Sequence, residues 1–216
     1  MKQQLVIFDC DGVLVDSEVI SNDVLAVQLS EAGLPTTLPQ ARATYQGLLL
    51  DEVVSEAEAQ LGRALPDGWL AEYERVRSER FRQELQPVPG AAELVSRVKA
   101  AGIEVCVASQ GKLEKTQLSL ELTGLRELFG EHALFSAHSV ARGKPAPDLF
   151  LHAAAEMGAA PERCAVVEDT PSGVTAAAAA GMLVFGYAAD SDQKALRSAG
   201  AWIVHELSEV AQQLRL

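Results

Sequence analysis

The pattern of apolar and polar positions divides this chain into two kinds of segment. Residues 5–8 form an unbroken apolar run, which is typical of a strand buried on both faces of a parallel sheet. After Pro89, similar short runs alternate with stretches whose apolar residues recur at helical spacing. The strands expected there are 103–108, 134–135, 164–167, 183–185 and 202–204. The helices expected there are 90–101, 112–123 (with Leu113, Leu118 and Leu122 buried), 147–157, 172–180, one before the last strand and one after it.

The segment between the first strand and Pro89 shows helical spacing only. Helices are expected at 18–33, 50–61 and 69–84, with a loop marked by Pro35 and Pro39. Because this segment interrupts the strand-forming part of the chain, it is expected to be a small helical domain inserted into an α/β core. The predicted boundaries are 1–16 and 88–216 for the core and 17–87 for the insert.

Strands that are separated by helices imply right-handed crossovers and a parallel sheet with helices on both faces. The predicted fold is therefore α/β, with a Rossmann-like parallel sheet and an inserted α-helical domain. In such sheets, ligands bind at the carboxyl ends of the strands. Polar residues that directly follow an expected strand are therefore the candidates for chemistry.

Two carboxylates and a glycine follow the first strand: Asp9, Asp11 and Gly12. Packing two like charges at the end of a buried strand costs free energy unless something compensates for them. A divalent cation with a preference for oxygen ligands is a natural compensation. Glycine lets the backbone turn sharply and approach a ligand closely. The alternative interpretation is a strand end with two solvated acids.

Three later segments also place polar groups after strands. Ser109, Gln110 and Gly111 offer a hydroxyl and backbone N–H groups, which suit an anion, although a serine there also fits a simple helix cap. Lys144 precedes a Pro-Ala-Pro segment, which either fixes its charge or is an ordinary loop. Glu168 and Asp169 repeat the acidic strand end, with helix capping by Asp169 as the alternative. Together the segments predict one magnesium site and one phosphate site.

Composition narrows the classes of partner. The chain has 216 residues, which suits one or two domains, and a net charge of −12 without a basic cluster, so nucleic acid is not expected as a partner. No membrane span and no signal peptide are expected. The three cysteines, Cys10, Cys106 and Cys164, lie in or beside apolar runs and are interpreted as reduced core residues of a cytoplasmic protein. None is followed six positions later by arginine, which disfavours a cysteine-nucleophile phosphatase.

The four polar segments, in this order, resemble the four motifs of the haloacid dehalogenase-like hydrolases. The resemblance covers nearly the whole chain. The position of the insert resembles the helical-cap subgroup, which includes phosphoglycolate phosphatase and β-phosphoglucomutase. The end of the chain and the stretch Asp16-Ser17-Glu18-Val19-Ile20 look most like bacterial 6-phosphogluconate phosphatase-like proteins. The resemblance makes residues 17–87 a cap and the remainder a hydrolase core.

The resemblance implies a Mg²⁺-dependent phosphatase that acts through an aspartyl-phosphate. Asp9 would be the nucleophile, and Asp11 would protonate the leaving group and then activate water. Mg²⁺ would be held by the Asp9 carboxylate, the Asp11 carbonyl and Asp169. Glu168 would either bind the metal directly or contact one of its ligands. The phosphoryl oxygens would be held by Ser109, Gln110, Gly111 and Lys144. The partner would be a small phosphorylated metabolite, a sugar or sugar-acid phosphate, and the protein is expected to be a monomer.

Three alternatives stay open at this point. A β-phosphoglucomutase-type mutase is weakened because Ser21, Gln46 and Leu50 replace the histidine and basic residues of those relatives. A dehalogenase needs no metal and would not use a second aspartate in the role of Asp11. A non-catalytic protein that binds phosphorylated metabolites is disfavoured by the complete set of polar segments. Candidate cap residues for specificity are Ser21, Asn22, Gln46, Gly47, Arg75 and Arg77, the last two interpreted mainly as helix surface.

Overall fold

The computed structural model describes residues 3–216, which form two compact units. Of the described residues, the sheet unit comprises 3–15 and Pro87–Leu216, and the helical unit comprises Asp16–Gln86. Val15 forms an antiparallel bridge with Pro87, so the chain leaves the sheet unit and returns to it at adjacent positions. The roles of hydrolase core and cap stay predictions for these units, because compactness alone does not assign a role.

The sheet unit contains six parallel strands in the order β3-β2-β1-β4-β5-β6. Their bounds are Leu5–Phe8 for β1, Glu104–Ser109 for β2, Leu134–Ser136 for β3, Cys164–Glu168 for β4, Leu183–Tyr187 for β5 and Trp202–Val204 for β6. All four residues of β1 are buried, as expected for a central strand covered on both faces. The predicted parallel α/β fold is confirmed.

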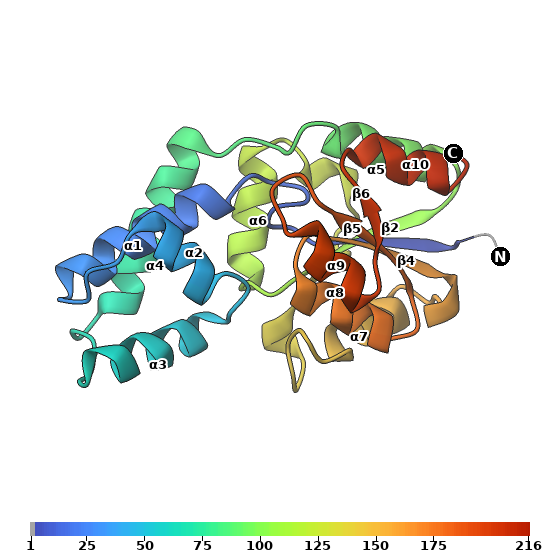
Figure 1. Ribbon diagram of the computed structural model, residues 1–216. Helices are drawn as coiled ribbons and strands as arrows, with labels where there is room; N and C mark the ends of the chain where they lie inside the picture. The colour runs from blue at the N-terminus through green and yellow to red at the C-terminus, as the bar shows by residue number, and fades with distance from the viewer. Residues whose placement is uncertain (1–2) are drawn as a thin grey trace. The chain divides into compact units, whose positions relative to one another are not determined.

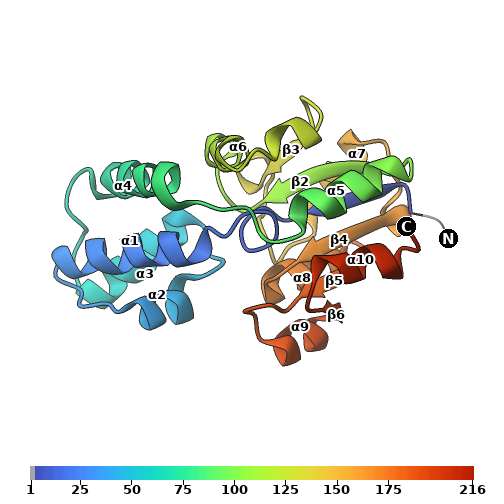
Figure 2. The ribbon, with the colours of Figure 1, turned by 90° about the horizontal axis from the view of Figure 1, so that it is seen from above.

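Helices cover both faces of this sheet. They are α5 (Ala91–Ala100), α6 (Leu113–Leu122), α7 (Asp148–Glu156), α8 (Pro171–Ala179), α9 (Gln193–Ala199) and α10 (Leu207–Gln213), with short 3₁₀ turns at Arg126–Leu128, Ala137–Ser139 and Pro161–Arg163. Helices α5 and α10 pack together on one face, and α7, α8 and α9 lie on the other (Figure 1). Figure 2 shows α5 and α10 in front of the strands. The free thiols of Cys10, Cys106 and Cys164 are all buried, as predicted.

The prediction for the buried face of α6 was wrong for two of its three leucines, and the third, Leu118, is half-buried. Leu113 and Leu122 are exposed, and the helix instead buries Thr116, Ser119 and Leu120. The Ser119 hydroxyl donates to the carbonyl of Lys115 at 2.9 Å. Because this bond satisfies the hydroxyl within the helix, the small polar side chain can be packed inside without a large desolvation cost.

The helical unit consists of α1 (Glu18–Glu31), α2 (Leu38–Tyr45), α3 (Leu50–Leu61) and α4 (Trp69–Glu84). Helix α2 lies where a loop was predicted from Pro35 and Pro39. Thr37 and Gln40 form a capping box, in which the Thr37 hydroxyl accepts from the backbone N–H of Gln40 and the Gln40 amide oxygen accepts from that of Thr37. Pro39 lies in the first turn, where its missing N–H costs no helical bond.

Within residues 3–216, no helix combines the length and the apolar character needed to cross a membrane.

Candidate active site

The candidate residues meet at one edge of the sheet. β2 and β4 both pair with β1, so the carboxyl ends of the three strands are neighbours. Asp9 follows β1, Ser109 ends β2 and Glu168 ends β4. The backbone N–H of Asp9 donates to Val167 at 2.9 Å, which continues the ladder one residue beyond the strand. The parallel topology therefore collects residues that lie far apart in the sequence.

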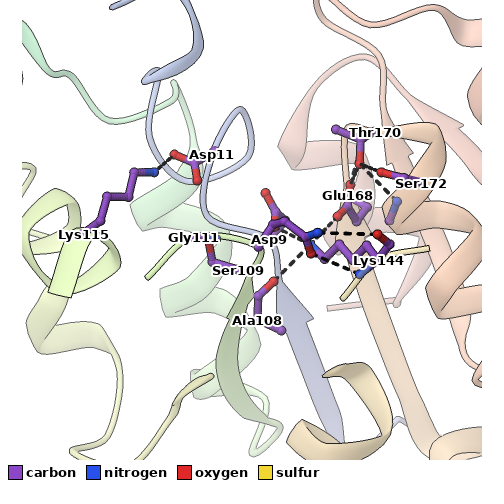
Figure 3. Close-up of polar contacts among 12 residues, drawn as sticks. Asp9, Asp11, Ala108, Ser109, Gly111, Lys115, Lys144, Glu168, Thr170 and Ser172 are labelled. Carbon is purple, nitrogen blue, oxygen red and sulfur yellow. Dashed lines mark hydrogen bonds and ion pairs between the residues drawn. The ribbon is translucent and has the colours of Figure 1, made fainter. Parts of the chain in front are cut away.

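Lys144 lies between two of these carboxylates. Its ammonium group donates to Asp9 Oδ1 and to Glu168 Oε1, both at 2.5 Å, and to the Ala108 carbonyl at 3.1 Å (Figure 3). Only 3% of the Lys144 side chain is exposed. Burial by itself would lower the pKa of Lys144, but the charges of Asp9 and Glu168 outweigh burial and raise the pKa above its usual range. Lys144 therefore stays charged and fixes the orientation of Asp9.

The electrostatics of Asp9 are dominated by its burial. Burial raises the pKa of the Asp9 carboxyl, Lys144 opposes the shift, and the charges of Glu168 and Asp11 add to it. A second positive charge beside this carboxylate would favour its ionised form.

Both oxygens of Glu168 are engaged with neighbouring residues. Oε1 accepts from Lys144, and Oε2 accepts from the backbone N–H and the hydroxyl of Thr170, each at 2.8 Å. A Cβ on Gly173 would lie 1.8 Å from Glu168 Oε1, so the glycine makes room for this carboxylate at the start of α8. Thr170, rather than Asp169, caps this helix, since its hydroxyl accepts from the N–H of Gly173 at 3.1 Å. These contacts indicate that Glu168 positions Lys144.

Asp169 lies against the backbone of the first motif. A Cβ on Gly12 would stand 2.2 Å from Asp169 Oδ2, and the φ angle of Gly12 is +77°. Gly12 thus gives the carboxylate the space beside the loop that also carries Asp11. Asp169 is 5% exposed and Asp9 is 6% exposed, so two largely buried carboxylates flank this loop.

A short network shapes the loop after β2. The Ser109 hydroxyl accepts from the N–H of Gly111 at 3.0 Å, and the hydroxyl of Ser136 donates to the carbonyl of Gly111 at 2.7 Å. The side-chain amide of Gln110 bonds both backbone groups of Lys144, at 3.1 and 3.4 Å. The Gln110 side chain therefore connects two loops. Because its amide is engaged in this way, the predicted contact of Gln110 with phosphate would be made by its backbone N–H.

Lys115 is a site residue that the sequence analysis missed. It lies on α6, and its ammonium group forms an ion pair with Asp11 Oδ1 (Figure 3). The two residues are 104 positions apart in the sequence. A lysine within an amphipathic helix is usually solvated surface, so no local signal distinguishes it. Ser136, at the end of β3, and Thr170, two residues after β4, were also missed, although both lie at strand ends.

The candidate cap residues behave differently from one another. Arg75 is exposed and pairs with Glu72 and Glu79 within α4, as expected for helix surface. Arg77 is only 8% exposed, with its guanidinium 5.0 Å from the ring centroid of Tyr73, so its interpretation as helix surface was wrong. Its long side chain packs over an aromatic ring, a contact that single-sequence periodicity does not reveal.

The metal-binding potential rests on a mixed set of oxygen atoms. Among residues 3–216, no three His, Cys, Asp or Glu side chains group as metal ligands. The carboxylates of Asp9 and Asp169, together with backbone oxygen from the loop between them, offer hard ligands. Mg²⁺ fits such a set because it commonly keeps several waters and takes only one or two carboxylates.

The sequence matches the family model of the haloacid dehalogenase-like hydrolases over residues 3–181. The chain therefore belongs to this family, and the resemblance inferred from its motifs is confirmed. It is 33% identical to the 6-phosphogluconate phosphatase of Escherichia coli (strain K12) over 192 residues, which cover 88% of this chain and 85% of that protein. The predicted enzyme class, a phosphoric monoester hydrolase, agrees with this match.

Two solved structures share the fold over nearly the full length. A hydrolase of this family from Deinococcus radiodurans R1, with bound phosphate and sodium, is 32% identical with a TM-score of 0.80, covering 99% of this chain and 95% of that one. A Thermotoga maritima protein, provisionally assigned as a β-phosphoglucomutase, is 26% identical with a TM-score of 0.79 and 98% coverage of both chains.

Proposed function

We propose that this protein is a Mg²⁺-dependent phosphatase that hydrolyses a small phosphate monoester, a sugar or sugar-acid phosphate, through an aspartyl-phosphate. The observation that carries the proposal is the Lys144 ammonium group, buried between Asp9 and Glu168 at the strand ends. It holds one carboxylate oxygen of Asp9 and thereby orients the other. A buried, oriented carboxylate suits nucleophilic attack on phosphorus.

Asp9 acts as the nucleophile, and Asp11 acts as the general acid and base. Asp9 attacks phosphorus, and the bond to the leaving oxygen breaks while Asp11 gives that oxygen a proton. Asp11 then takes a proton from the water that attacks the phosphorylated Asp9, and phosphate leaves. Acid–base help of this kind contributes about 10²- to 10⁴-fold in rate.

The loop after β2 receives the phosphoryl oxygens. The Ser109 hydroxyl and the backbone N–H of Gln110 supply donors, the Gly111 N–H bonds the Ser109 oxygen and so holds that hydroxyl in place, and Lys144 supplies positive charge. Donors that are held in place before the reaction contribute much of the electrostatic stabilisation in such sites. The bonds from Ser136 and Gln110 keep this loop in shape.

Asp9, the Asp11 carbonyl and Asp169 would hold Mg²⁺, which supplies positive charge that lets an anionic carboxylate approach an anionic phosphate. The space that Gly12 leaves for Asp169 supports this assignment. Both oxygens of Glu168 already accept hydrogen bonds, so Glu168 would not bind the metal itself but would hold Lys144 in place beside Asp9. The helical unit would act as the cap that excludes water during turnover.

The choice of substrate class rests on relatives. The Escherichia coli protein that is 33% identical acts on 6-phosphogluconate, as its name states, and a further Escherichia coli relative, hexitol phosphatase B, is 34% identical over 178 residues. Both names describe polyhydroxylated phosphate esters. We extend this class, rather than either substrate, to the present chain.

The test is phosphate release from a panel of sugar phosphates, sugar-acid phosphates, phosphoglycolate and nucleotides, with Mg²⁺ or with EDTA. Magnesium-dependent release that favours the sugar or sugar-acid phosphates is expected. Release that persists unchanged in EDTA would contradict the metal assignment, and no release from any panel member would contradict the phosphatase.

A phosphomutase is the second candidate, because the Thermotoga maritima structure resembles this chain over its full length. Conversion of β-glucose 1-phosphate to glucose 6-phosphate, followed alongside phosphate release, separates the two. The phosphatase predicts free phosphate from the panel and negligible isomer, and the mutase predicts the reverse.

A further inference from the structure

Lys115 lies beside Asp11, the proposed general acid and base, and has no role of its own in the proposed mechanism. Its ammonium group pairs with Asp11, and its aliphatic chain passes the loop after β2, where a Cβ on Gly111 would lie 3.4 Å from Lys115 Cδ. The exposed fractions of the two side chains are 11% for Lys115 and 22% for Asp11, so the pair is largely shielded from water. In Figure 3 it lies apart from the group formed by Asp9, Lys144 and Glu168.

The position of Lys115 is fixed by the helix that carries it. Thr116 and Leu120 on α6 are buried, and the Ser119 hydroxyl bonds the carbonyl of Lys115 itself. Asp11, by contrast, lies on the short loop between β1 and α1. A helix-anchored cation thus restrains a carboxylate on a loop, which reduces the number of orientations open to that carboxylate.

We propose that Lys115 is a positioning residue that holds the Asp11 carboxyl group in the orientation needed for proton transfer. This role rests on the proposed phosphatase function, in which Asp11 passes a proton to the leaving oxygen and recovers one from water. Lys115 itself forms and breaks no covalent bond and transfers no proton. Misplacing a reacting group by about 1 Å can cost on the order of 10²-fold in rate, so loss of this restraint is expected to matter.

The leaving group provides a readout that a structural role would not move. A dinitrophenolate leaves without help from an acid, whereas a sugar alkoxide needs a proton in the transition state. We therefore compare kcat/KM for 2,4-dinitrophenyl phosphate with kcat/KM for the best alkyl phosphate of the panel. Lys115→Met removes the charge and keeps most of the chain, Lys115→Arg keeps the charge, and Lys194→Met removes an exposed charge on α9 as the matched control.

For Lys115→Met, kcat/KM for the alkyl phosphate is expected to fall by about 10- to 100-fold, while that for the aryl ester falls less than about threefold. Lys115→Arg should recover most of the loss, and Lys194→Met should resemble the wild type. An equal loss of kcat/KM for both esters would mean that Lys115 only supports the fold. An increase in kcat/KM would mean that the ion pair with Lys115 hinders proton transfer by Asp11. Either result overturns the proposal.

A double-mutant cycle tests whether Lys115 acts through Asp11. In an Asp11→Asn background, Lys115→Met should have little further effect on kcat/KM for the alkyl phosphate, the ester on which the same change is costly when Asp11 is intact. Additive losses would overturn the proposal. Unfolding midpoints identify a variant that fails to fold, and Lys115→Gln, which also removes the charge, then replaces Lys115→Met in the comparison of the two esters. A wild-type protein that hydrolyses neither ester would instead contradict the proposed function itself.

Discussion

The side chain of Gln110 binds the backbone of Lys144 at both of its polar groups. Gln110 Oε1 accepts from the Lys144 N–H at 3.1 Å, and Gln110 Nε2 donates to the Lys144 carbonyl at 3.4 Å. A Cβ on Gly143 would lie 2.8 Å from Gln110 Nε2, so the preceding glycine makes room for this contact. The loop after β2 thus helps to place the lysine that holds Asp9.

Replacing Gln110 should therefore impair catalysis through Lys144. Gln110→Ala removes two neutral hydrogen bonds, each contributing about 1 kcal/mol, and kcat/KM is expected to fall by about tenfold. Gln110→Glu can accept from the N–H but places a carboxylate against the carbonyl, so its loss should be larger. Inhibition by inorganic phosphate should weaken in both variants. The exposed Gln213→Ala is the control, and unchanged kinetics in Gln110→Ala would exclude this role.

Gly12→Ala should weaken Mg²⁺ binding. The new Cβ would collide with the Asp169 carboxylate, and the positive φ angle adds strain. Gly158→Ala is a matched control, because Gly158 has a φ angle of +68° and no atom within 4 Å of the added Cβ. The expected result is a Mg²⁺ activation constant raised by about tenfold or more for Gly12→Ala alone, in keeping with the usual effect of disturbing a ligand's support. Equal constants in both variants would contradict the metal assignment of Asp169.

Lys144→Met should destabilise the protein strongly. It would leave the buried carboxylates of Asp9 and Glu168 without their shared cation, and breaking a buried pair in this way costs about 3–5 kcal/mol. Urea unfolding in the presence of EDTA measures the decrease in the free energy of unfolding. The double variant Lys144→Met/Glu168→Gln removes one of the two charges and should regain part of the stability. If the single variant matched the wild type, the three groups would not be coupled.

Asp9→Asn should abolish turnover and keep the fold. The amide has nearly the same shape as the carboxylate but cannot act as the nucleophile. Acid-quenched wild-type protein incubated with substrate should carry a phosphoryl group detectable by mass spectrometry, and Asp9→Asn should not. Phosphorylation of the variant at the wild-type level would overturn the nucleophile assignment.

Strands and helices whose formation depends on neighbouring residues in the chain were predicted well from the sequence. The apolar runs correctly indicated all six strands, and the helices 50–61 and 69–84 agree with α3 and α4. Helix α2 was missed because prolines were taken to mark only a loop, although Pro39 occupies a first turn with a capping box. The face of α6 was misjudged because hydrophobicity alone ignored the hydroxyl of Ser119, which is satisfied within the helix and can therefore be buried.

By itself, the sequence determined the parallel α/β fold and the strand ends at which polar groups gather, since both follow from local periodicity and from the rules of strand connection. Only the tertiary structure decided which groups touch. Lys144 meets Asp9 across 135 residues, and Lys115 meets Asp11 across 104. Such contacts depend on how the helices and loops pack around the sheet, and a lysine that forms a buried ion pair has the same local sequence signal as one in water.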